Sequence, residues 1–207
     1  ECDNYGNYIF VSCDKYGLLS PKGKVLIKAS YDNLESIAKD LYIASIYLED
    51  RCNMKHGVID VNGNVIIDFN YHYLQPFYGR VLRSYLSPNI NIELKDVEIP
   101  EKIEHLLIYN YGFGLIDLKG NMCILPGHKD IQKTEYGFIL NKDNKYGYAA
   151  LDYSIICEPK YASIEEVGNG FKRVSVSTSF GLRYGIMDQS GKECLEPIYI
   201  SIGNMNK

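Results

Sequence analysis

Three aspartates recur at one place in the sequence and are the first groups to consider for acid–base chemistry. Asp60, Asp117 and Asp188 each stand three residues before a glycine, at the end of a short apolar run. Two carboxylates held close together could act as general acid and general base. However, Asp at the start of a turn commonly accepts hydrogen bonds from the backbone of that turn. We therefore expect these aspartates to stabilise turns and not to act as paired catalytic acids.

Six cysteines could form disulfides or bind zinc. No Cys-x-x-Cys occurs, so a structural zinc site is not expected. Cys123 and Cys194 follow a turn glycine by three residues, and Cys157 takes a place that isoleucine holds elsewhere in the repeat described below. We expect these three to be small core residues with free thiols. The others precede a repeat unit or lie near the N-terminus: Cys2, Cys13 and Cys52.

Neither the histidines nor the glycines form a recognisable catalytic or nucleotide-binding motif. His72 and His105 have no Ser or Cys nucleophile signature near them in the sequence. The stretch from Gly17 to Lys24 superficially resembles a phosphate-binding loop, but it has five residues between its glycines and Val25 where Ser or Thr must bind magnesium. We therefore predict no catalytic residue, no metal site and no cofactor.

The elements that position these groups come from an internal repeat. Five times an aromatic or His residue precedes a glycine, and another aromatic or His follows that first ring by fifteen residues. The first rings, which we call the ring residues, are Tyr16, His56, Phe113, Tyr146 and Tyr184. Such self-similarity indicates a repeat architecture.

Each repeat is expected to form β-strands. Short apolar runs flank turns such as Val-Asn-Gly-Asn and Leu-Lys-Gly-Asn, a pattern typical of β-hairpins, and a further β-rich run precedes each ring residue. Each unit is therefore predicted to be a three-stranded antiparallel meander. One meander cannot bury both faces, so neighbouring units must stack. The predicted fold is all-β, with five tandem antiparallel hairpin or meander repeats stacked as a short twisted solenoid. A closed barrel-like or propeller-like arrangement is the alternative.

The ring residues are predicted to be structural anchors. Glycine has no Cβ, so a neighbouring ring can lie flat on the backbone or the strand can bend there. Burying such a ring contributes roughly 1.5–3 kcal/mol. Repeated aromatics at fixed spacing usually pack in a core, which favours a structural role for them over ligand binding.

These stretches resemble the bacterial WG β-repeat (KWG repeat) family, with its tryptophan replaced by Tyr, His or Phe. The resemblance is carried by stretches such as Lys55-His56-Gly57-Val58-Ile59-Asp60 and Glu158-Pro159-Lys160-Tyr161. It implies a β-rich bacterial repeat protein without catalytic residues. We predict one WG-like domain over 1–207, with units near 7–37, 41–77, 105–131, 136–167 and 170–201.

One interval between ring residues is longer than the others. The spacings are 40, 57, 33 and 38 residues, so the second interval holds an insertion at 78–102. Insertions in repeat proteins form surface loops, often on the binding side. Tyr78, Arg80, Arg83 and Tyr85 combine two side chains that are enriched at interface hot spots. They are the candidate binding residues, and an exposed local extension of two strands is the alternative.

Composition excludes several classes of function. The 207-residue chain is 46% hydrophobic and has a net charge of -4, which indicates a folded protein without a basic face for nucleic acid. No apolar run reaches the length of a membrane span. Free thiols favour the bacterial cytoplasm over a secreted or periplasmic location. The sequence starts at Glu1 without Met, and a removed signal peptide is left open.

The predicted function is a non-enzymatic binding module that presents a tyrosine-rich β surface to a protein partner. Tyrosine offers contact area and a hydroxyl at low entropic cost. The 19 tyrosines exceed the places that the repeat offers for aromatics, so several lie elsewhere. The alternatives are a carbohydrate-binding protein, and an inhibitor or immunity protein for a bacterial enzyme or toxin that uses charge complementarity. A hydrolase is the least favoured class.

Overall fold

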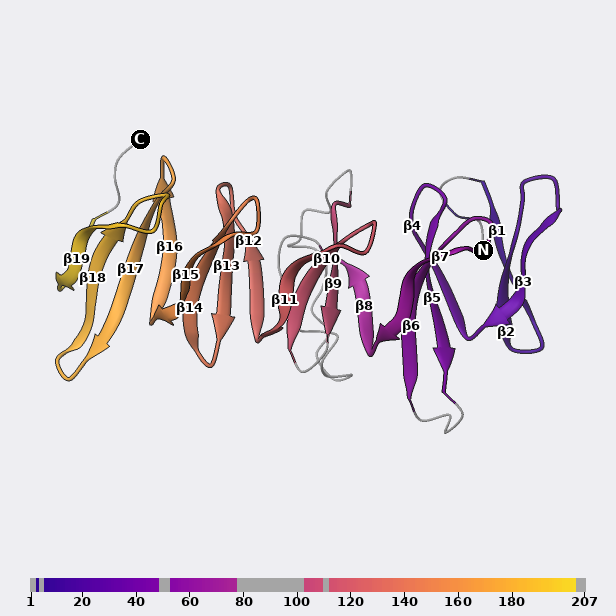
Figure 1. Ribbon diagram of the computed structural model, residues 1–207, viewed down its shortest axis with the longest axis horizontal. Helices are drawn as coiled ribbons and strands as arrows, with labels where there is room; N and C mark the ends of the chain where they lie inside the picture. Colours follow the sequence, from indigo (N-terminus) through magenta and orange to yellow (C-terminus); the bar gives the residue numbers. More distant parts are fainter. Residues whose placement is uncertain (1–2, 4–5, 49–52, 78–102, 110–111, 204–207) are drawn as a thin grey trace. The chain divides into compact units, whose positions relative to one another are not determined.

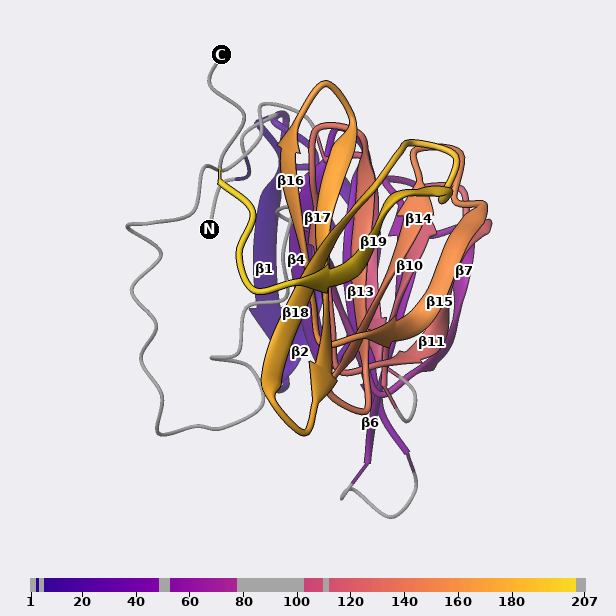
Figure 2. The ribbon, with the colours of Figure 1, turned by 90° about the vertical axis from the view of Figure 1, so that its left-hand side faces the viewer.

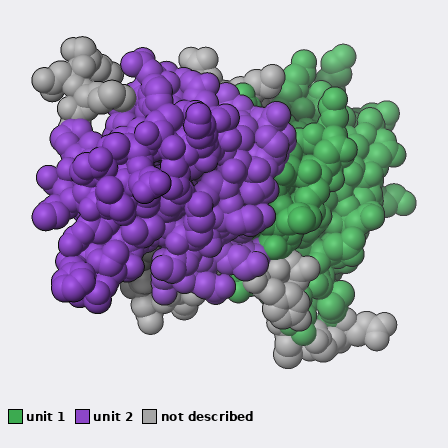
Figure 3. Space-filling view, turned by 60° about the vertical axis from the view of Figure 1, so that its left-hand side comes forward, with its two compact units in different colours: residues 1–78, 94–126 green, residues 79–93, 127–207 purple. Residues whose placement is uncertain are grey.

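The computed structural model describes residues 3, 6–48, 53–77, 103–109 and 112–203. Their regular structure consists of 19 β-strands (Figure 1). The chain divides into two compact units, residues 1–78 with 94–126 and residues 79–93 with 127–207 (Figure 3).

Unit 1 contains three antiparallel sheets in chain order. The strands of the first are β1 (Tyr8–Ser12), β2 (Lys15–Leu19) and β3 (Val25–Tyr31). Those of the second are β4 (Asn33–Ala38), β5 (Leu41–Tyr47), β6 (Met54–Asp60) and β7 (Val65–Tyr71). The third has β8 (Tyr73–Pro76), β9 (His105–Tyr109), β10 (Phe113–Asp117) and β11 (Met122–His128), whose last two residues belong to unit 2.

Unit 2 contains two further four-stranded antiparallel sheets. The strands of the first are β12 (Asp130–Lys133), β13 (Gly137–Lys142), β14 (Lys145–Ala150) and β15 (Ile155–Tyr161). Those of the second are β16 (Ser163–Gly168), β17 (Phe171–Thr178), β18 (Gly181–Met187) and β19 (Glu193–Tyr199). The prediction of five all-β antiparallel repeats is confirmed, and none of the sheets formed by the described strands closes into a barrel.

The prediction of three strands per unit is wrong for four of the five sheets, which have a fourth strand. After the second aromatic of a repeat the chain leaves its sheet and forms the first strand of the next one. These first strands are short edge strands, and β12 contains a single buried apolar residue, Ile131. Such a segment lacks the alternation that identifies a strand from sequence. The 33-residue spacing still accommodates four strands because β13 and β14 are joined by only two residues, Asp143 and Asn144, both with positive φ.

The glycine after each ring residue permits a close approach between two strands. In the hairpin of β14 and β15, Tyr146 pairs with Tyr161 and Tyr148 with Cys157, so two steps along β14 correspond to four along β15. This bulge brings the backbone of β15 onto Gly147, where a Cβ would lie 2.6 Å from the Cys157 carbonyl oxygen. The other four repeat glycines have the same approach at 2.4–2.7 Å. In the first, second, fourth and fifth repeats the ring residue and the second aromatic are cross-strand partners.

Within each unit the sheets stack face to face. We call the face that carries the residue directly after the repeat glycine, such as Val58, the back face, and the opposite face the front face. The back face of β4–β7, with Ile43, Val58 and Ile67, packs on the front face of β8–β11, with Leu106 and Ile116. Two other clusters join β1–β3 to β4–β7 and β12–β15 to β16–β19 in the same way. Each core thus forms between a back face and the next front face.

Candidate binding surface

The four candidate binding residues of the insertion, Tyr78, Arg80, Arg83 and Tyr85, lie outside the described residues, as does the whole of the 78–102 segment. The ring residues are described. Phe113 is buried at 2% exposure, whereas Tyr16, His56, Tyr146 and Tyr184 are half-buried. The Nδ1 atom of His56 lies 2.8 Å from the hydroxyl of the fully buried Ser45.

The recurring aspartates stabilise turns, as predicted. The Asp60 Oδ1 atom accepts backbone N–H bonds from Asn62 and Asn64, each at 2.8 Å, and Asp117 makes the equivalent bonds in its own turn. Asp188 accepts bonds from the hydroxyl and backbone of Ser190. The Ser190 side chain is the main cause of the low pKa of Asp188. The three carboxylates are engaged in their own turns.

The cysteines divide between core and surface. Cys157 is buried, as predicted, whereas Cys194 is exposed and Cys123 half-buried, so the core prediction is wrong for Cys194. Alternation along the strand explains the difference, because the place of Cys157 is held by the buried Ile67 and the place of Cys194 by the exposed Ile66. Cys157 and Cys194 form no disulfide within the part of the chain that the structure describes.

A buried polar cluster joins the two sheets of unit 2. The Tyr148 hydroxyl on the back face of β12–β15 donates to Glu166 Oε1 at 2.5 Å, and Thr134 donates to the same oxygen at 2.6 Å. Lys172 is fully buried, donates to the Gly170 carbonyl at 2.8 Å and lies 4.0 Å from the centre of the Tyr148 ring. Burial lowers the pKa of Lys172 and, with the Glu166 bond, raises that of Tyr148.

Sequence reasoning missed Lys172, although the repeat register contains a signal for it. Lys172 pairs with Met187 as Tyr42 pairs with Ile59 and Leu106 with Ile116. The corresponding positions in the other four-stranded sheets of the chain are therefore large and apolar, and a lysine there departs from the repeat.

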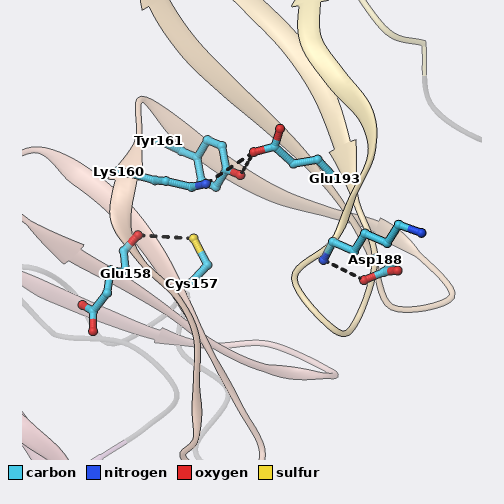
Figure 4. Close-up of polar contacts among 7 residues, drawn as sticks. Cys157, Glu158, Lys160, Tyr161, Asp188 and Glu193 are labelled. Atoms are coloured by element: carbon cyan, nitrogen blue, oxygen red, sulfur yellow. Dashed lines mark hydrogen bonds and ion pairs between the residues drawn. The ribbon is translucent and has the colours of Figure 1, made fainter.

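A second polar contact joins the same two sheets at their margin (Figure 4). The hydroxyl of the buried Tyr161 on β15 donates to Glu193 Oε1 on β19 at 2.5 Å, and Lys160 lies 3.4 Å from the same oxygen. The Tyr161 hydrogen bond is the main cause of the lowered pKa of Glu193. These side chains are satisfied by one another, so they hold the sheets in register. The described residues contain no cluster of His, Cys, Asp and Glu that could hold a metal ion.

The most distinctive exposed feature of unit 2 lies on its last sheet, which Figure 2 views from outside. Phe180, in the turn between β17 and β18, is 84% exposed, Ile200 is 78% exposed and Ile198 is 61% exposed. Leu182 and Tyr199 are also exposed. We call these five residues the C-terminal apolar surface. Because Tyr184 pairs with Tyr199, the β17–β18 turn and the end of β19 lie at the same end of the sheet.

Hydrogen bonds hold this turn in place and leave Phe180 outside. The Thr178 hydroxyl accepts from the Phe180 N–H at 3.2 Å and donates to the Gly181 carbonyl at 2.7 Å. Arg183 Nη1 donates to the carbonyls of Phe180 and Leu182 at 3.2 and 3.0 Å. The turn therefore exposes a phenyl ring at the end of the sheet where Leu182 and Tyr199 are also exposed. Apolar side chains gathered at one end of a sheet are a feature of interaction sites.

Comparison with known proteins agrees with the repeat. Residues 16–46 and 57–79 match the model of the WG containing repeat, which confirms the predicted resemblance for the first two units. None of the curated proteins compared with the chain matches it. Among solved structures, one titled "Crystal structure of the eukaryotic initiation factor" is 7% identical, with a TM-score of 0.33 over 92% of this chain and 62% of that one.

The chain thus spans about 62% of the length of that solved chain, and a likeness at this TM-score carries no argument. In the parts of the chain that the structure describes, no helix has the length and apolarity needed to cross a membrane.

Proposed function

We propose, for a chain that carries WG repeats in its first two units, that the protein is a non-enzymatic binding module whose C-terminal apolar surface contacts a protein partner. The observation that carries this proposal is the exposure of Phe180, Ile198 and Ile200 on one end of one sheet. Each would gain roughly 1.5–3 kcal/mol on full burial, so together they could supply the centre of an interface.

The composition of this surface favours a protein partner over a glycan. Three of its five residues are aliphatic, namely Leu182, Ile198 and Ile200, and Arg183 bonds to the Leu182 carbonyl. Sugars are bound by polar side chains together with aromatic rings, whereas aliphatic side chains around an aromatic anchor suit an apolar protein surface. The tyrosine-rich character predicted from sequence is represented here by Tyr199.

The use of the buried polar groups supports a non-enzymatic role. Tyr148, Glu166 and Thr134 satisfy one another between two stacked sheets, and Tyr161 and Glu193 do the same. We further propose that the protein works in a reducing compartment, the bacterial cytoplasm. Exposed thiols such as those of Cys13 and Cys194 are maintained there.

Quantitative affinity capture from lysate of the native organism tests the proposal. The baits are the wild-type chain and a Phe180→Ser, Ile200→Ser double variant, which removes apolar contact area at two exposed positions. Leu125→Ser is the matched control because Leu125 is 71% exposed but lies on β11, outside this surface.

We expect a stoichiometric protein with the wild type and the Leu125 control, and its loss from the double variant. Equal capture by all three baits would reject the C-terminal apolar surface as the site. The candidate site would then be the insertion, with Tyr78, Arg80, Arg83 and Tyr85. A bait in which residues 78–102 are shortened would test that site.

A further inference from the structure

The back face of β16–β19 has the residues of a face that packs on another sheet. Ile186 directly follows the repeat glycine of its sheet. In the sheets whose back faces are covered, the residues at this position are at most 1% exposed, namely Leu18, Val58 and Tyr148. Tyr199 is 43% exposed, whereas at the same position Tyr161 is buried at 1% exposure and Tyr31 and Tyr71 are half-buried. In the described residues no sheet follows β16–β19. This face therefore exposes side chains at positions that are core positions elsewhere.

The segment after β19 repeats the sequence that leads from one sheet to the next. Tyr199-Ile200-Ser201-Ile202 corresponds to Tyr161-Ala162-Ser163-Ile164, which carries the chain from β15 into β16. Ile164 is buried against the back face of β12–β15, and Ile202 is half-buried. The segment and the back face thus both have the pattern that precedes a further stacked sheet.

A complementary face exists on β1–β3. Tyr8 pairs with Leu19 as Tyr42 pairs with Ile59, so Tyr8 and Leu19 lie on the front face of their sheet. Tyr42 and Leu106, at the Tyr8 position of the next two sheets, are fully buried, whereas Tyr8 is 47% exposed. The first sheet therefore exposes a front face and the last sheet exposes a back face, and these are the two kinds of face that pack together within each unit.

The charge on the last back face suits aromatic residues on the opposing surface. Arg173 takes the place of the buried Ile43 and Ile139, and its guanidinium bonds to Glu165 at 2.6 Å and to the Ile202 carbonyl at 2.8 Å. Arginine packs on aromatic rings while it keeps such hydrogen bonds. The front face of β1–β3 carries two aromatic rings, those of Tyr8 and Phe10, in the register of that face.

We propose that the back face of β16–β19 binds the front face of β1–β3 of a second copy of this chain, so that copies add head to tail. The proposal rests on the proposed function, because the back face of β16–β19 includes Leu182 and Tyr199 of the C-terminal apolar surface. The two faces are different surfaces, which makes the contact heterologous and its growth open-ended unless the rotation closes a ring.

Light scattering coupled to size-exclusion chromatography of the purified chain, over a wide range of concentrations, provides the test. Tyr8→Asp alters the front face and Tyr199→Asp the back face, with Leu182→Asp as a second back-face variant should Tyr199→Asp fail to fold. Tyr47→Asp is the matched control because Tyr47 is 48% exposed and lies in neither docking sheet. Circular dichroism checks that each variant is folded.

The wild type and Tyr47→Asp are expected to gain mass with concentration, and each face variant to weaken association by about tenfold or more. An equimolar mixture of a front-face and a back-face variant should form a heterodimer, since each retains the face that the other lacks. A wild type that stays monomeric overturns the proposal, as does a face variant that associates normally or a mixture that forms no heterodimer. A monomeric chain that still captures another protein through Phe180 and Ile200 would reject self-stacking alone and leave the proposed function standing.

Discussion

Replacing Gly147 by alanine should destabilise unit 2 through a steric clash. The added Cβ would lie 2.6 Å from the Cys157 carbonyl oxygen, 2.7 Å from the Pro159 nitrogen and 2.9 Å from the Glu158 carbonyl carbon. All three are backbone atoms of β15, so the rotation of a side chain cannot relieve the clash. Ordinary contact begins at 3.4 Å, so β15 would have to move by several tenths of an ångström.

That movement would disturb a packed core. β15 carries the buried Cys157 and Tyr161, and the Tyr161 hydroxyl is bonded to Glu193. Overpacking of this kind typically costs about 1–3 kcal/mol, and we expect the upper half of that range because backbone must shift. For a protein of this size the melting temperature should fall by roughly 4–12 °C.

Urea and thermal unfolding followed by circular dichroism measure the effect. Gly203→Ala is the matched control because its Cβ would meet nothing within 4 Å, and it should change stability by less than about 0.5 kcal/mol. If Gly147→Ala unfolded at the same urea concentration as Gly203→Ala, the close-approach explanation of the repeat glycine would be wrong.

Two further predictions concern the polar groups between the sheets of unit 2. Lys172→Met should stabilise the protein by about 1–2 kcal/mol at neutral pH, because it removes a buried ammonium from a place that is apolar in other sheets. Because the pKa of Lys172 is lowered in the folded protein, the wild type should gain stability as the pH rises through that pKa. The difference in unfolding free energy between Lys172→Met and the wild type should therefore narrow, and a constant difference would contradict this. Glu193→Gln should cost about 1 kcal/mol at pH 7, because the charged acceptor of the Tyr161 hydroxyl is lost. Because the pKa of Glu193 is lowered in the folded protein, its contribution to stability is present above the ordinary value of 4.5 and is lost in acid. The unfolding free energies of Glu193→Gln and the wild type, measured in urea, should therefore become equal in acid. A difference that persists in acid would contradict this prediction.

The sequence predicts the hairpins better than it predicts their neighbours. The ring–glycine pair and the turn glycine locate β2 with β3 and β6 with β7, because hairpin signals lie within a few residues of each other. The first strands of the four-stranded sheets were missed because they are short, and because each follows the end of one repeat in the sequence but pairs with the strands of the next repeat. The sequence predicts that the strand can bend at the glycine. The close approach of a carbonyl of the paired strand to this glycine can be known only from the register of the hairpin.

The candidate surface was missed for a different reason. The sequence pattern favours the insertion, where the spacing of the ring residues changes. Ile198 and Ile200 stand where Lys160 and Ala162 stand in the preceding repeat, so the apolar replacement of a lysine could have been found by comparing the last two units. Whether such residues are exposed depends on which sheet follows, and this is a property of the stack and not of one repeat.

Site-specific photo-cross-linking is the most direct test of whether the C-terminal apolar surface contacts a protein partner. A photoreactive phenylalanine analogue is placed at position 180 and, as the control, at position 125, since both native side chains are largely exposed. The chain is then irradiated in lysate of the native organism. We expect a discrete protein adduct from position 180, which includes the case of a second copy of this chain, and none from position 125. No adduct at position 180, or the same adducts at both positions, would contradict it.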